Sequence, residues 1–149
     1  MRVLIVFNHP APYKVRLFNE LGKYVDLTVI FERKQASDRN KDFYLDKPEN
    51  FKCITLTTGY IGKEGSLSSQ VKDYIKKHSE DFDYIIMNGY SHIAEIKAIN
   101  YMQSHKIKYG LMVNGGFVRK EGIIKRRLKT RLISGASFYF SPTNNSDSY

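Results

Sequence analysis

Arg2-Val-Leu-Ile-Val-Phe-Asn8 is the stretch that decides the fold, because it holds an unbroken run of β-branched, aliphatic and aromatic residues. A strand with one face in water alternates apolar and polar residues, whereas a strand buried on both faces shows no alternation. Asp26-Leu-Thr-Val-Ile-Phe31 has the same character, and Lys14–Lys23 between the two places its apolar residues on one face of a helix. A strand, a helix and a strand within about 30 residues predict a pair of parallel strands joined by a crossover helix.

Strands and helices are predicted to alternate along the rest of the chain as well. The predicted strands are 52–57, 84–87, 109–113 and 137–140, and the predicted helices are 67–78, 92–105 and 123–133. This alternation indicates an α/β domain with a doubly wound, largely parallel sheet. The polar stretch 32–51 is expected to be a long loop.

The length and composition fit one ordinary globular domain. The chain has 149 residues, close to the usual size of about 150 residues per domain. Hydrophobic residues make up 42% and charged residues 26%, which excludes a disordered, collagen-like or coiled-coil chain. The 24 Lys and Arg residues outnumber the 15 Asp and Glu residues, giving a net charge of +9. Such a surplus favours a phosphate-bearing partner.

The sequence also predicts where the protein works. Cys53 is the single cysteine, so the chain cannot form an intramolecular disulfide, and no Cys or His pair has zinc-ligand spacing. The first apolar run, Val3–Phe7, is too short for a membrane span or a signal peptide. We therefore expect a cytoplasmic protein without a bound metal.

The last segment suggests that the natural protein is longer. Ser141–Tyr149 offers several helix N-cap residues, yet the sequence stops before a helix could follow. We expect residues 1–149 to be one domain that ends before a further domain, and a natural polar tail is the alternative.

The first candidate binding loop is Asn8-His-Pro-Ala-Pro-Tyr13, which follows the first predicted strand. Ligands of open α/β sheets bind at the carboxyl ends of the strands, so His9, Pro10 and Tyr13 are candidate binding residues. His9 is otherwise an exposed turn residue. The loop contains no G-x-G-x-x-G, and the chain has no Walker lysine loop, so we expect no NAD, FAD or other cofactor.

The second candidate loop is Asn88-Gly-Tyr-Ser-His92. Gly89 would let the backbone approach a ligand, and Ser91 and His92 could bind a sugar hydroxyl or a phosphate. In the alternative interpretation, Ser91 caps the next helix and His92 is simply exposed. Glu95 is expected to be solvated near His92. No catalytic residue is predicted, because no carboxylate pair or Ser-His-Asp arrangement stands out.

The third candidate loop contains Asn114, Gly115 and Gly116 after a predicted strand. Two adjacent glycines indicate either a bare turn or a ligand that passes over the backbone.

A basic helix is the fourth feature. Ile124, Leu128 and Leu132 form its expected buried stripe, and Ile123 and Ile133 are also expected to be buried. The basic residues that spread over the rest of its surface are Lys125, Arg126, Arg127, Lys129 and Arg131. This surface is either simply solvated or a contact for anionic lipid, ligand phosphate or nucleic acid. Nucleic acid ranks last, because the helix has no aromatic residue for stacking on bases.

Several segments together resemble a known family. Pro10-Ala-Pro-Tyr-Lys-Val-Arg-Leu-Phe-Asn-Glu-Leu21, followed by Asp26–Phe31, resembles the opening of family 4 glycosyltransferases with the GT-B fold, which have a P-x-P-Y-R-V-x-L-F-x-x-L pattern before a D-L-T-V strand. Tyr84–His92 and Arg119–Leu132 resemble later segments of the same family. The likeness covers nearly the whole chain.

The resemblance implies the N-terminal, acceptor-side domain of a two-domain retaining glycosyltransferase, with a Rossmann-like sheet. In that family a C-terminal domain holds most of the nucleotide-sugar donor, so the domain alone is expected to be inactive. The implied acceptor is a glycan or a lipid-linked glycan of bacterial surface polysaccharide, and the implied location is the cytoplasm, peripherally on the inner face of the cell membrane. The alternative is a standalone, non-catalytic α/β module that binds an anionic partner through the basic helix.

Overall fold

The computed structural model describes residues 1–33, 46–56, 64–90, 92–112 and 122–140. Strands and helices alternate along these residues as the sequence predicts, except that the strands at 26–31 and 52–55 follow each other with no helix among the described residues between them. The elements are β1 (Arg2–Phe7), α1 (Pro12–Leu21), β2 (Asp26–Phe31), β3 (Lys52–Thr55), α2 (Glu64–His78), the short 3-10 helix η3 (Ser79–Asp81), β4 (Tyr84–Met87), α3 (Ile93–Ser104), β5 (Gly110–Met112), α4 (Ile123–Ser134) and β6 (Phe138–Phe140).

The six strands form one parallel sheet in the order β3-β2-β1-β4-β5-β6. The chain builds outward from β1 through β2 to β3 and then returns to the other side of β1 with β4. This order confirms the predicted doubly wound, Rossmann-like α/β class. Connections at the amino ends of the strands, such as 22–25 and 135–137, are short, and the connection 113–122 at the carboxyl ends is longer. Segment 32–51 runs from the carboxyl end of β2 to the amino end of β3.

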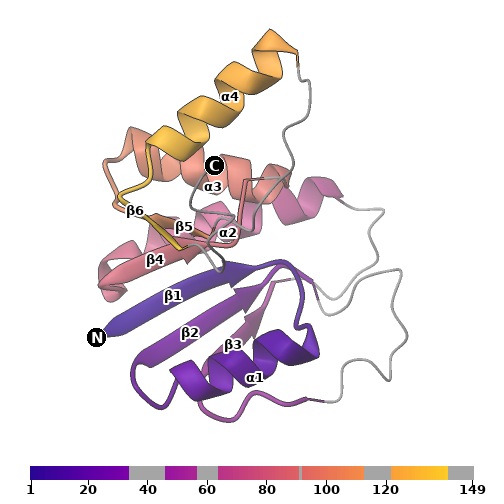
Figure 1. Ribbon diagram of the computed structural model, residues 1–149, viewed down its shortest axis with the longest axis vertical. Helices are drawn as coiled ribbons and strands as arrows, with labels where there is room; N and C mark the ends of the chain where they lie inside the picture. The colour runs from indigo at the N-terminus through magenta and orange to yellow at the C-terminus, as the bar shows by residue number, and fades with distance from the viewer. Residues whose placement is uncertain (34–45, 57–63, 91, 113–121, 141–149) are drawn as a thin grey trace.

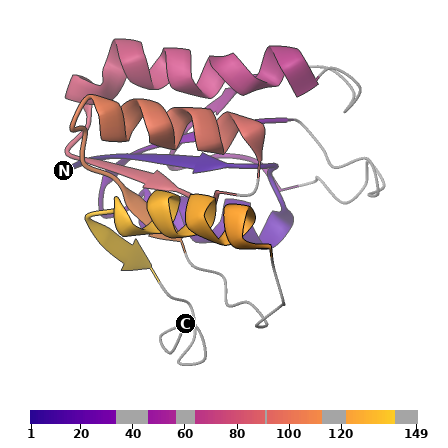
Figure 2. The same ribbon diagram turned by 90° about the horizontal axis from the view of Figure 1, so that it is seen from above.

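Helices cover both faces of the sheet, which explains the continuous apolar run in β1. Leu4 and Val6 belong to a core cluster with residues of α2 and α3, whereas Val3 and Ile5 belong to a second cluster with Phe18 of α1. In Figures 1 and 2 the helices α2 and α3 lie on one side of the central strands and α1 lies on the other. Leu132 of α4 belongs to the cluster of α2 and α3. Each such buried side chain contributes about 1.5 to 3 kcal/mol, so this strand anchors both layers.

The basic helix departs from its predicted packing. The expected stripe is buried only at its last residue: Ile124 is 87% exposed, Leu128 42% and Leu132 1%. Ile123, also expected to be buried, is 73% exposed, and Ile133 is half-buried. The stripe exists, but the body of the protein covers only the C-terminal half of α4, so the prediction of a fully buried stripe is wrong.

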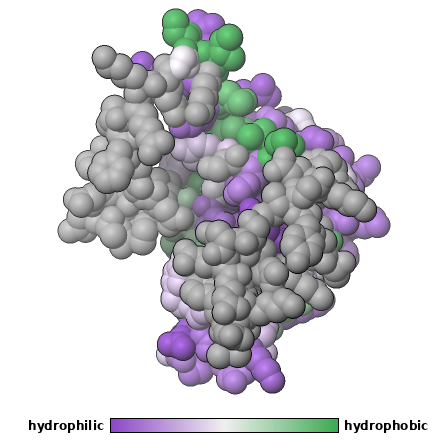
Figure 3. Space-filling view, turned by 90° about the vertical axis from the view of Figure 1, so that its right-hand side faces the viewer, coloured by the Kyte–Doolittle hydropathy of each residue, from purple (hydrophilic) through white to green (hydrophobic). Residues whose placement is uncertain are grey.

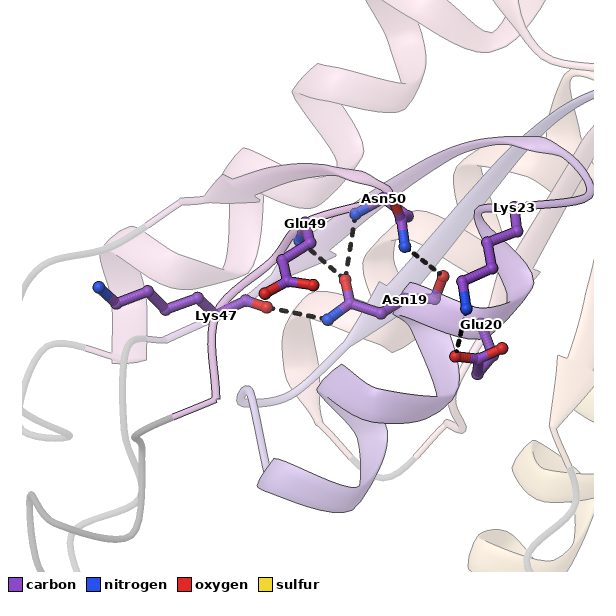
Figure 4. A network of polar contacts seen from close by, with 6 residues as sticks. All are labelled: Asn19, Glu20, Lys23, Lys47, Glu49 and Asn50. Atoms are coloured by element: carbon purple, nitrogen blue, oxygen red, sulfur yellow. Dashed lines mark hydrogen bonds and ion pairs between the residues drawn. The ribbon is translucent and has the colours of Figure 1, made fainter.

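Helix α1 holds the segment that leads into β3. The Asn19 side-chain oxygen accepts hydrogen bonds from the N–H groups of Glu49 (2.8 Å) and Asn50 (3.2 Å), and its amide donates to the Lys47 carbonyl (2.9 Å). The Asn50 amide donates in turn to the Asn19 carbonyl at 3.2 Å (Figure 4). A Cβ atom at Gly22 would overlap the Asn50 carbonyl oxygen, so the close approach of the two segments requires glycine there. This end of the predicted long loop is therefore fixed against α1.

We expect Asn19→Ala to lower the free energy of unfolding by about 1 to 2 kcal/mol, because it removes three hydrogen bonds made by one side chain. Glu20→Ala is the matched control, because Glu20 is exposed and its side chain forms an ion pair with Lys23, just after the end of the same helix. Urea unfolding of both variants measures the difference. Equal stability of the two variants would contradict the anchoring role of Asn19.

Candidate functional site

The carboxyl ends of β1 and β4 lie side by side where the strand order reverses. The two strands pair in parallel, with Val6 opposite Met87, and the Asn88 N–H donates a hydrogen bond to the Val6 carbonyl at 3.0 Å. The loops that begin at Asn8 and Asn88 therefore leave the same edge of the sheet, toward the right in Figure 1. We call this edge, where Asn8, Glu32 and Asn88 follow their strands, the carboxyl edge.

The loop after β1 makes a tight turn into α1. The His9 N–H donates to the Asn8 side-chain oxygen at 2.8 Å, and the Ala11 N–H donates to the His9 carbonyl at 2.9 Å. His9 and Pro10 are half-buried, whereas Tyr13, in the first turn of α1, is 65% exposed. These residues stay together at the beginning of α1, at the carboxyl edge.

A lysine accompanies this loop. The Lys14 ammonium lies 5.0 Å from the centre of the Phe7 ring and 5.5 Å from that of Tyr13. Partial burial lowers the pKa of Lys14. A cation held over aromatic rings close to the carboxyl edge is suited to an anionic or hydroxyl-rich ligand.

The loop after β4 leads into α3 through His92. His92 is the N-cap of α3, one residue later than the predicted cap Ser91, which lies outside the described residues. Gly89 is half-buried, and a Cβ atom placed on it would lie 3.8 and 3.9 Å from the two carboxylate oxygens of Glu95. Gly89 does not have a positive φ, so the backbone conformation does not require glycine.

Glu95 is buried, and the expectation that it is solvated is wrong. Its side chain belongs to a residue only 1% exposed, and one carboxylate oxygen accepts a hydrogen bond from the His92 N–H at 3.0 Å. The third position of a helix lets a carboxylate reach back to the N-cap amide and face the positive end of the helix dipole. With this hydrogen bond formed, the Glu95 carboxylate is buried and lies close to Gly89.

Glu32 is a second buried carboxyl, and the sequence analysis did not single it out. It follows β2 directly, its N–H donates to the Phe7 carbonyl at 2.9 Å, and it is 6% exposed. Burial, followed by repulsion from the Glu95 charge, raises the pKa of Glu32 to about 8, and Arg33 opposes the shift. Its position immediately after an unbroken buried strand is the signal that could have identified it.

The carboxyl edge thus offers hydrogen-bonding groups of different kinds. At neutral pH Glu32 keeps its proton and can donate a hydrogen bond, as a carboxyl group with a raised pKa does. The buried side-chain oxygen of Asn88 has no hydrogen-bond partner among the described residues and can accept one. Donors and acceptors at a strand-order reversal are suited to a polyhydroxylated ligand, and the assignment of His9, Gly89 and His92 to its binding site stays a prediction.

The remaining predicted site residues either lie outside the described residues or lie on α4. Asn114, Gly115, Gly116 and the side chain of Lys125 lie outside the described residues. Arg126 and Arg127 are exposed on the first half of α4, and Lys129 is half-buried. Arg131 lies at the far end of the helix, where it lines an open depression of about 390 Å³ with Lys106 and Lys108. This depression borders the segments that precede β5 and β6, so Arg131 lies away from the carboxyl edge.

No group of three or more His, Cys, Asp or Glu side chains among the described residues could hold a metal ion. In the same part of the chain, none of the helices combines the length and the apolar character needed to cross a membrane.

The comparisons with known proteins define the fold. No protein-family model matches the sequence, and a search of curated proteins finds no relative. Among solved structures, the chain is similar to UDP-GlcNAc 2-epimerase from Methanocaldococcus jannaschii, with a TM-score of 0.60 at 17% identity over 99% of this chain and 41% of that one. A putative UDP-N-acetylglucosamine 2-epimerase from Listeria monocytogenes gives 0.61 at 17% identity, covering 99% of this chain and 40% of that one.

A third similar structure is Arabidopsis thaliana UGT89C1 in complex with UDP, with a TM-score of 0.52 at 12% identity, covering 95% of this chain and 42% of that one. The chain thus spans about 40% of the length of these structures. The likeness supports a GT-B-like fold and does not distinguish glycosyltransferase family 4 from other GT-B-like enzymes.

The buried Glu32 carboxyl gives the domain a testable pH dependence. Its pKa is about 8 in the folded chain against 4.5 as the ordinary value, so the folded state binds the extra proton between these two values. The proton on Glu32 therefore stabilises the folded state fully below pH 4.5, and this stabilisation declines as the pH rises from 4.5 to 8. We expect Glu32→Gln to become more stable relative to the native chain between pH 5 and pH 8, by about 3 kcal/mol.

Urea unfolding of both chains at the two pH values measures this change. Glu80→Gln, at an exposed position on η3, is the matched control and should follow the native chain at both pH values. A Glu32→Gln difference that is constant with pH would contradict a proton held on Glu32.

Proposed function

We propose that this chain is the N-terminal, acceptor-side half of a two-domain, GT-B-like enzyme that transfers a sugar from a nucleotide-sugar to an acceptor hydroxyl. The observation that carries the proposal is the pairing of hydrogen-bonding loops at the strand-order reversal: His9 after β1 and Gly89 and His92 after β4 share one edge. The similar structures support a nucleotide-sugar enzyme, because they include a UDP-GlcNAc 2-epimerase from Neisseria meningitidis bound to UDP-GlcNAc and UGT89C1 in complex with UDP.

The proposal gives the carboxyl edge to the acceptor. Residues of the three predicted loops would line the acceptor: His9, Pro10, Tyr13, Gly89, Ser91, His92, Asn114, Gly115 and Gly116. The donor would be held mainly by a C-terminal domain, in keeping with a chain that spans about 40% of the similar structures. Glu32 and Glu95 would stand behind these residues as buried groups that fix the shape and charge of the edge.

The chemistry and the setting follow the family resemblance of the sequence. We propose that transfer retains the configuration of the sugar and that the acceptor is a lipid-linked glycan in bacterial surface-polysaccharide synthesis. The enzyme would work in the cytoplasm, at the inner face of the cell membrane, without a bound cofactor. The Pro10–Leu21 segment, which carries the resemblance most specifically, forms the turn and the helix that follow β1.

A nucleotide-sugar epimerase is a second candidate, because several of the similar structures are UDP-GlcNAc 2-epimerases. The epimerase and the transferase differ in whether the reaction needs an acceptor. An epimerase changes the nucleotide-sugar without an acceptor, whereas a transferase releases the nucleotide only when an acceptor is present.

We expect the 149-residue chain alone to transfer no sugar, because the groups that would hold and orient the donor lie in the proposed second domain. The assay offers a panel of nucleotide-sugars with a lipid-linked glycan and measures nucleotide release. Turnover by this chain alone would contradict the two-domain proposal. The same assay on the chain extended by a second α/β domain should give acceptor-dependent release, and inversion at C2 of UDP-GlcNAc without acceptor would indicate the epimerase instead.

Gly89 provides a test of the site in the extended, active enzyme. Gly89→Ala should leave the free energy of unfolding within about 0.5 kcal/mol, because the added methyl meets only ordinary contacts at 3.8 and 3.9 Å. It should weaken acceptor use, measured as kcat/KM, by roughly tenfold or more if the acceptor passes over this residue. Gly122→Ala is the matched control, since a Cβ atom there meets nothing within 4 Å. Equal kinetics for the two variants would remove Gly89 from the site.

A further inference from the structure

The start of α4 carries apolar side chains that the rest of the protein leaves exposed. Ile124, Leu128 and Leu132 are spaced by four residues and share one face of the helix, yet their exposure falls from 87% to 42% to 1% along it. Ile123 beside them is 73% exposed. We call Ile123, Ile124 and Leu128 the apolar tip. Burial of two adjacent isoleucines is the usual fate of such residues, so their exposure points to a partner.

The charge around the apolar tip restricts that partner. Helix α4 has the sequence IIKRRLKTRLIS, with five basic residues and no acidic one. Arg126 and Arg127 are exposed and lie within one turn of the tip. A second copy of this chain, packed tip against tip, would bring two sets of arginines together without acidic partners on either helix. An anionic surface with an apolar interior satisfies both the isoleucines and the arginines.

The position of the apolar tip relates it to the carboxyl edge. In Figure 1 the strands point to the right, and α4 begins on that same side and rises away from α3. Figure 3 views the molecule from this side and shows hydrophobic residues gathered at the top, beside hydrophilic ones. The tip therefore projects on the side of the molecule to which the loops of His9 and His92 belong.

We propose that the apolar tip inserts into the interface of an anionic lipid bilayer, with Arg126 and Arg127 at the level of the phosphate headgroups. Long basic side chains keep their charges at this level while apolar neighbours enter the acyl region. The inference rests on the proposed function in one respect. If the acceptor is lipid-linked, it reaches the carboxyl edge from the same bilayer surface to which the apolar tip is bound. Surface attachment itself depends only on the tip and its charges.

Vesicle flotation of the 149-residue chain tests the attachment without any sugar or nucleotide. The probes are vesicles of phosphatidylcholine alone and of phosphatidylcholine mixed with phosphatidylglycerol, at low and high salt. We expect binding to the anionic vesicles only, with weaker binding at high salt, because the charge attraction is screened. Ile123→Ser with Ile124→Ser should reduce the partition coefficient roughly tenfold or more, since it removes the apolar side chains that insert.

Two charge reversals of equal size make the test specific to this surface. Arg126→Glu with Arg127→Glu should also reduce binding roughly tenfold or more, because it reverses the charge nearest the headgroups. Lys76→Glu with Lys77→Glu, at exposed positions near the end of α2, is the matched control and should retain most of the binding. Circular dichroism confirms that each variant keeps its secondary structure.

Three results would overturn the inference. One is equal binding to neutral and anionic vesicles, another is unchanged binding after the isoleucine substitutions, and the third is a dimer in solution that these substitutions convert to a monomer. Failure here leaves the proposed sugar transfer intact and removes only its proposed location at the membrane surface, since an enzyme without surface attachment can still transfer sugar. Conversely, vesicle binding by a chain whose extended form shows no transfer would keep the attachment and reject the enzyme.

Discussion

Burial of β1 on both faces is the constraint on which the rest of the structure depends. Alternate residues of this strand supply two separate core clusters, so helices must lie on both sides of the sheet. The chain first extends the sheet to one side with β2 and β3 and then to the other with β4, β5 and β6. This central position fixes the strand-order reversal next to β1. The polar loops that end β1 and β4 meet there as a consequence of how the core is covered.

The sequence predicted the order and type of the elements closely, because each has a strong local signal. Its limit is visible in α4, where the spacing of Ile124, Leu128 and Leu132 correctly indicated a shared face. Periodicity says which residues lie on one side of a helix, but not how far the neighbouring element extends along it. Helix α4 contacts the body of the protein through its C-terminal half and not at Ile124. The extent of this contact depends on tertiary packing, which no local sequence pattern records.

The candidate site divides in a similar way. His9, Gly89 and His92 could be predicted as neighbours, because parallel strands bring their carboxyl ends to one edge. Glu95 could not, because a glutamate in the first turn of a helix is usually solvated, and Glu32 had only its position directly after a buried strand as a signal, yet both are buried. Glu32 joins the site through the pairing of β2 with β1, and Glu95 joins it by turning back to the amide of His92.

The unequal lengths of the connections at the two edges have an evolutionary consequence. At the amino ends of the strands the joins are short and tightly fitted, and a Cβ atom at Gly135 would overlap the Gln103 side chain. Insertions there would separate helices from the sheet that they cover. The longer join at the other edge, 113–122, can change in length and composition while the core stays the same. Descendants of one ancestral domain can therefore acquire different specificities by varying only half of their connections.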